Sequence, residues 1–125
     1  LLHMGHIAYL NEARGLGDIL VVGVNTDRSV RALKGPQRPI IPEEERSHLL
    51  AALECVDYVV LFDEDTPLDL IRAVRPDILV KGADYAKNEV VGYDIVESYG
   101  GKVALIPLVE NKSTTALINR IKERH

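Results

Sequence analysis

The chain has 125 residues and a mass of 13.9 kDa, which is the size of one domain. Its 46% hydrophobic residues can form a core without a disulfide framework, and its single cysteine predicts a reducing, cytoplasmic setting. The net charge of −4 and the aromatic content of 5% argue against nucleic acid as a partner. No apolar run approaches the roughly 18 residues of a membrane span, so no membrane partner is expected.

The first half of the chain alternates stretches of helical periodicity with apolar runs. Residues 5–14 predict a helix with one apolar face, and residues 18–25 predict a strand buried on both faces. Pro42 begins the next helix, at a position where its missing N–H costs nothing. A second strand is predicted over residues 57–62.

The second half continues the alternation. Thr66 is expected to cap a short helix that closes at Arg75, which precedes a proline. Residues 77–81 predict a third strand and residues 102–107 a fourth. The helix between these two strands contains Ile95 and ends at a pair of glycines.

The last segment is also predicted to be a helix, from Ser113 to about Arg124, with Leu117, Ile118 and Ile121 inward. Strands that alternate with helices indicate βαβ units, and hence an α/β fold with a parallel sheet and helices on both faces. The chain opens on a helix, where such a fold normally begins with a strand. We therefore expect that an upstream, central strand is absent and that residues 1–125 form one N-terminally incomplete domain.

Two histidines flank the start of the first helix in the sequence His3-Met4-Gly5-His6. Gly5 allows the backbone to approach a ligand, and the amides at a helix N-terminus attract anions. The two histidines could donate hydrogen bonds to phosphate oxygens as charge develops on them. The same spacing also suits surface histidines near a chain end, or zinc ligands. The residues alone leave these alternatives open.

Three consecutive hydroxyl side chains, Ser113, Thr114 and Thr115, precede the last apolar run. One hydroxyl suffices to cap a helix. Three in a row favour the binding of phosphate oxygens at a helix N-terminus, although simple capping remains the alternative.

Polar residues also follow the predicted strands at their carboxyl ends, where ligands bind in open α/β sheets. Asn25 and Asp27 follow the first strand, Lys81 and Asp84 follow the third, and Lys34 lies in a basic loop restricted by prolines. Helix capping, a polar turn and a solvated loop are the respective alternatives. We expect one edge of the sheet to bring together His3, Asn25, Lys81 and Ser113.

Together these motifs resemble the cytidylyltransferase-like nucleotidyltransferases, a superfamily with a His-x-Gly-His motif and a Rossmann-like fold. The resemblance covers the whole chain, including Gly17-Asp18, the Lys34-Gly35 loop and Glu45-Arg46. Within the superfamily, four stretches are most similar to the D-glycero-β-D-manno-heptose 1-phosphate adenylyltransferases: residues 22–30, 63–68, 75–85 and 109–115. Two features depart from the family pattern. The first strand is missing, and Asn111 lies where a glycine is usual.

The resemblance implies transfer of AMP from ATP to the heptose 1-phosphate, giving ADP-heptose and pyrophosphate for lipopolysaccharide core or surface glycan synthesis. It implies catalytic roles for His3, His6 and Lys34. The nucleotide would be bound by Gly5, His6, Asn25, Asp84, Ser113, Thr114 and Thr115. The acceptor would be bound by Asp27, Lys34, Arg46 and Lys81.

The family also implies the cofactor and partners. Mg²⁺ would arrive with ATP and need few protein ligands. A homodimer is expected, with the domain fused to or paired with a sugar kinase domain. A CTP-dependent glycerol-3-phosphate cytidylyltransferase is the nearest alternative. A nucleotide-binding module without turnover is the alternative from another class.

Overall fold

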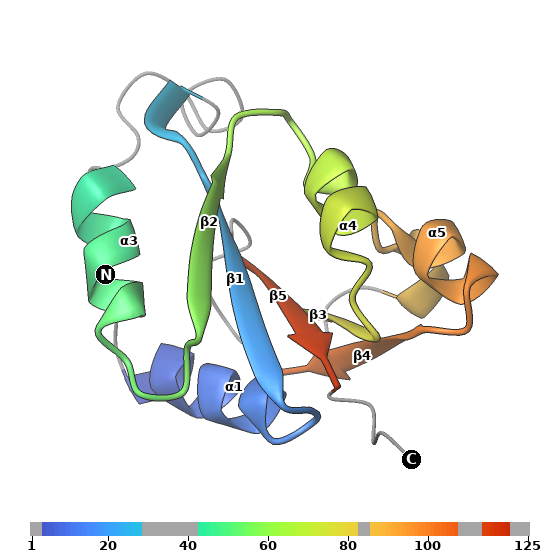
Figure 1. The fold of residues 1–125 in the computed structure, drawn as a ribbon, viewed down its shortest axis with the longest axis horizontal. Coiled ribbons are helices and arrows are strands. Elements are labelled where there is room, and N and C mark those ends of the chain that lie inside the picture. The colour runs from blue at the N-terminus through green and yellow to red at the C-terminus, as the bar shows by residue number, and fades with distance from the viewer. Residues whose placement is uncertain (1–3, 29–42, 83–85, 108–113, 121–125) are drawn as a thin grey trace, which may run out of the picture.

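The computed structural model describes residues 4–28, 43–82, 86–107 and 114–120. They form a five-stranded sheet in the order β2-β1-β5-β3-β4 (Figure 1). The strands are β1 (Ile19–Asn25), β2 (Tyr58–Phe62), β3 (Ile78–Gly82), β4 (Lys102–Ile106) and β5 (Thr114–Asn119). The helices are α1 (Met4–Arg14), α3 (Glu43–Ala51), α4 (Leu68–Val74) and α5 (Tyr93–Ser98), with a short 3-10 helix η1 (Lys87–Glu89) before α5.

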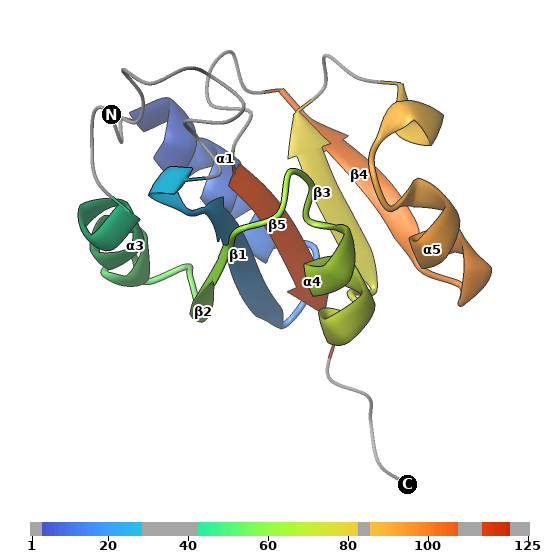
Figure 2. The ribbon, with the colours of Figure 1, turned by 90° about the horizontal axis from the view of Figure 1, so that it is seen from above.

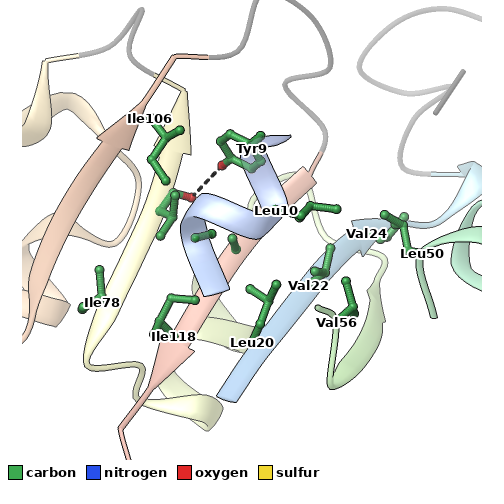
Figure 3. Close-up of a cluster of buried hydrophobic side chains, with 13 residues drawn as sticks. Tyr9, Leu10, Leu20, Val22, Val24, Leu50, Val56, Ile78, Ile106 and Ile118 are labelled. Atoms are coloured by element: carbon green, nitrogen blue, oxygen red, sulfur yellow. Dashed lines mark hydrogen bonds between the residues drawn. The ribbon is translucent and has the colours of Figure 1, made fainter. Parts of the chain in front are cut away.

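The core lies on both faces of the sheet, because successive side chains of a strand point to opposite faces. On one face, α1 and α3 pack against the sheet through Leu10 and Leu50 (Figure 3). On the other face, Ile71 of α4 and Val96 of α5 pack against the sheet residue Leu79. The predicted α/β fold with helices on both faces is therefore confirmed. No described helix is long and apolar enough to cross a membrane.

The first four strands and the four α-helices lie where the sequence predicts them, within a few residues. The predicted cap of α4 is wrong. The N-cap residue is Pro67 rather than Thr66, and no side chain caps this helix. The carbonyl of Pro67 instead accepts the Ile71 amide at 2.9 Å. Arg75 does close α4, in a left-handed conformation with φ 49°.

The predicted last helix is a strand. Residues 114–119 form β5, which is antiparallel to both of its neighbours, β1 and β3. The β1–β2 and β3–β4 pairs are parallel, so the sheet is mixed rather than wholly parallel. The burial of β5 explains the difference. Ala116 and Ile118 pack on the α1 side and Leu117 on the α4 side, all fully buried. A helix on the surface would bury only one stripe of these side chains.

The centre of the sheet is consequently occupied. The strand in that position is β5, which lies between β1 and β3, and the expectation that an upstream strand is absent from this chain stays a prediction. Without β5, the backbone N–H and C=O groups along the facing edges of β1 and β3 would lack hydrogen-bond partners. Further hydrogen bonds anchor the end of β5: the Asp18 amide donates to the Asn119 carbonyl at 2.9 Å, and the Arg120 amide donates to Asp77 Oδ2 at 2.8 Å.

Candidate functional site

The candidate site lies at the edge of the sheet where β1, β3 and β4 end. In Figure 2 these three strand ends lie toward the top, together with the start of β5 and the start of α1. Strand ends of this kind are where ligands bind in open α/β sheets. The structure thus brings the described predicted residues to one edge, from β1, α3, β3, β5 and α1.

Three of the predicted site residues form one cluster at the end of β1. Arg46 reaches over from α3, and its NH2 group donates to the Asn25 carbonyl at 2.8 Å and to Asp27 Oδ1 at 3.2 Å. The Arg46 side chain is 17% exposed. Its charge therefore acts in a partly water-excluded environment, where it is screened less than on the open surface. The guanidinium holds the chain in place as it leaves the sheet.

A second cluster at the same edge was not predicted from the sequence. The Asp63 carboxylate, just after β2, accepts hydrogen bonds from the Thr26 hydroxyl and the Arg28 guanidinium. The hydrogen bonds from Arg28 and Thr26 lower the pKa of Asp63, and the same contact with Asp63 raises the pKa of Arg28. One signal could have revealed this cluster. Two parallel neighbouring strands end at the same edge, so the polar residues that follow them meet.

Lys81 and Thr115 form the third contact at this edge. Nζ of Lys81, on β3, donates to Oγ1 of Thr115, on β5, at 3.4 Å. Thr115 is buried and lies opposite Gly23 of β1. Because side chains alternate along a strand, Lys81 and Thr115 lie on the α4 side of the sheet. A residue assigned to the acceptor and one assigned to the nucleotide are thus direct neighbours.

His6 lies in the first turns of α1 and is buried. It precedes Tyr9 and Leu10 by three and four residues, so all three share the helix face that packs on the sheet. The Tyr9 hydroxyl donates to the Val80 carbonyl at 3.4 Å (Figure 3), and burial raises the pKa of Tyr9. These contacts place the start of α1 over the end of β3. His6 is therefore at the same edge as Lys81, on the opposite face of the sheet.

Several predicted residues fall outside the described part of the chain. They are His3, Lys34, Asp84 and Ser113. Gly5 and Thr114 are described as backbone only, in α1 and β5 respectively. The premise that Ser113, Thr114 and Thr115 open a helix is wrong, because residues 114–119 pair with β1 and β3 as a strand. The backbone of this segment is engaged in the sheet and does not offer a helix N-terminus.

Metal ligands and the single cysteine are two further groups that could contribute chemistry. The described residues contain no group of three or more His, Cys, Asp or Glu that could hold a metal ion. Cys55 is partly buried beside the α1-side core, and burial raises the pKa of its thiol. A thiol with a raised pKa is a poor nucleophile at neutral pH, which agrees with the role of a small core residue.

Comparison with known proteins identifies the family. The cytidylyltransferase-like family model matches residues 1–120. The chain belongs to this family. It is 64% identical over 125 residues to the bifunctional protein HldE of Syntrophotalea carbinolica and 62% identical over 125 residues to that of Trichlorobacter lovleyi. Each alignment covers 100% of this chain and 26% of the relative. The chain therefore spans about a quarter of the length of these relatives.

A solved structure supports the same assignment. The crystal structure of the lipopolysaccharide core biosynthesis protein from Thermoplasma volcanium matches with a TM-score of 0.69 and 33% sequence identity. The match covers 89% of this chain and 89% of that chain. This chain and the solved structure therefore share a nucleotidyltransferase-like fold over most of the length of each.

Proposed function

We propose that this chain is the adenylyltransferase part of an enzyme that transfers AMP from ATP to D-glycero-β-D-manno-heptose 1-phosphate. The products are ADP-heptose and pyrophosphate. The observation that carries the proposal is the 64% identity over the whole chain to a bifunctional HldE protein. The name of the structural neighbour, a lipopolysaccharide core biosynthesis protein, points to the same use of the product.

The reaction needs positioning more than acid–base chemistry. An oxygen of the sugar phosphate attacks the α-phosphorus of ATP, and the bond from that phosphorus to the bridging oxygen breaks. The electron pair leaves with pyrophosphate. A phosphate monoester is already anionic at pH 7, so no general base is required. The protein must align the two phosphates and stabilise the charge that develops between them.

The described residues supply groups suited to this task. His6 lies at the start of α1, where an imidazole N–H and the helix dipole both favour phosphate oxygens. Lys81 and Thr115 provide an ammonium and a hydroxyl on the other side of the strand ends. Asn25 and Asp27, held by Arg46, lie at the end of β1. His3, Lys34, Asp84 and Ser113 complete the proposed set from the sequence.

The proposal includes the cofactor and the wider protein. Mg²⁺ enters bound to the phosphates of ATP, as part of the substrate, and needs few protein ligands. Use of ATP agrees with a cytoplasmic reaction. The relatives are named bifunctional and are about four times as long as the matched chain, since it covers 26% of them. We therefore propose that this domain is fused to, or works with, a sugar kinase domain that makes its acceptor, and that the protein is a homodimer.

A pyrophosphate-release screen tests the proposed function. ATP and CTP are each combined with heptose 1-phosphates of both anomeric configurations and with glycerol 3-phosphate. The full-length protein should release pyrophosphate with ATP and the β-heptose 1-phosphate. Turnover with CTP and glycerol 3-phosphate instead would identify a cytidylyltransferase. Nucleotide binding without pyrophosphate release from any pair would identify a binding module.

A further inference from the structure

Asp63 connects the end of β2 to the segment that follows β1. Its Oδ1 accepts a hydrogen bond from Oγ1 of Thr26, and Nε of Arg28 lies 2.9 Å from Oδ2 and 3.2 Å from Oδ1. The NH2 group of Arg28 also donates to Oδ2. A planar guanidinium with two nitrogens on one carboxylate is a directional contact. Thr26 and Arg28 are the residues on either side of Asp27.

The backbone reinforces this connection. The Thr26 amide donates to the Phe62 carbonyl at 2.9 Å, one step beyond the last register pair, Asn25 with Phe62. On the other side, Arg46 of α3 contacts the side chain of Asp27. The short segment around Asp27 is thus held by β2 through Asp63 and by α3 through Arg46.

Stability alone does not account for the Asp63 contacts. The Arg28 and Asp63 side chains are 76% and 44% exposed, and exposed ion pairs contribute little to the free energy of unfolding. The Asp69–Arg72 pair is similarly exposed but joins two residues of α4, so it orients no other segment. Asp63 differs because its partners lie 35 and 37 residues away, at the end of another strand.

We propose that Asp63 is a positioning residue, which holds Thr26 and Arg28 so that Asp27 is oriented toward the sugar 1-phosphate acceptor. This inference rests on the proposed function, in which Asp27 binds the acceptor. Asp63 itself does not touch a substrate. Its effect is on the orientation of the acceptor site, and the residues proposed to bind the nucleotide, His6 and Thr115, lie on other elements, α1 and β5.

The first test measures the contact without any reaction. Amide hydrogen exchange at Thr26 is compared in the full-length wild type, D63A, D63N and the control D69A. Loss of the carboxylate should speed exchange at Thr26 in D63A by about threefold or more, because local opening becomes easier. D69A should match the wild type. Equal protection in D63A and D69A overturns the proposal, whatever the enzyme turns over.

The second test separates positioning from general structural damage. D63A should raise KM for the sugar 1-phosphate by about threefold to tenfold, with kcat and the KM for ATP changed less than about twofold. D63N should lie between D63A and the wild type, since its amide oxygen can still accept from Thr26. A change confined to ATP, or a uniform fall in kcat with lower thermal stability, overturns the positioning role. A wild type without turnover refutes the proposed function and the acceptor role together, while the exchange result still decides whether Asp63 holds Thr26.

Discussion

The most informative test of the fold concerns Gly17, in the turn between α1 and β1. A Cβ at position 17 would overlap Cγ2 of Ile118 and lie 3.0 Å from the carbonyl oxygen of Asn119. Carbon atoms normally approach no closer than about 3.5 Å. Ile118 is fully buried, so its side chain cannot move into solvent. This crowding exists only because β5 lies in the centre of the sheet.

Gly17→Ala should therefore lower the free energy of unfolding by about 1–3 kcal/mol, the usual cost of overpacking a core. Gly15→Ala, in the same turn, is the matched control. Its Cβ would meet only backbone oxygens at 3.4 and 3.7 Å, so a change within about 0.5 kcal/mol is expected. Urea denaturation followed by circular dichroism measures both variants.

A double mutant identifies the atom responsible. In an Ile118→Ala background the overlapping methyl group is gone, and Gly17→Ala should cost at least about 1 kcal/mol less than in the wild type. The remaining cost comes from the Asn119 carbonyl. If Gly17→Ala behaves like Gly15→Ala, or if its cost is the same in both backgrounds, β5 does not pack against this turn and the central position of β5 is wrong.

Three further results are expected. His6→Ala should slow turnover by about 10²–10³ while ATP binding, measured by calorimetry, changes little, because the imidazole acts on charge that develops during transfer; an equal loss of ATP affinity with unchanged turnover would contradict this role. Lys34→Ala should raise KM for the sugar phosphate about ten- to hundredfold with ATP affinity almost intact, since a charge-assisted contact contributes roughly 1.5–3 kcal/mol; no kinetic change above about twofold would make Lys34 a surface residue. The Asp63 contacts should persist at neutral pH and be lost only as the pH falls through the lowered pKa of Asp63, because the contacts in the folded protein favour the ionised carboxylate. NMR titration of the Asp63 carboxyl checks this, and an ordinary or raised pKa would refute it.

Much of this fold follows from local sequence signals. Continuous apolar runs marked β1 and β2, and helix-terminating residues such as Arg75 before a proline marked the ends of helices. The helices on both faces followed, because strands buried on both faces require cover on each. The edge that carries Asn25 and Lys81 could also be predicted, since strands that run in the same direction in one sheet end at the same edge. His3, Lys34, Asp84 and Ser113 remain predictions from the sequence.

Tertiary structure decided what depends on distant partners. Leu117, Ile118 and Ile121 fit a helical stripe, yet the apolar run Ala116-Leu117-Ile118 also fits a strand buried on both faces, so local periodicity could not choose between the two. Residues 114–119 form a strand because the facing backbone edges of β1 and β3 need hydrogen-bond partners, which a strand between them supplies. The Asp63 contact also depends on tertiary structure. Asp63 reaches Thr26, 37 residues earlier, only because β1 and β2 lie side by side. Contacts of this kind are set by which strands become neighbours, and no local pattern in the chain encodes that.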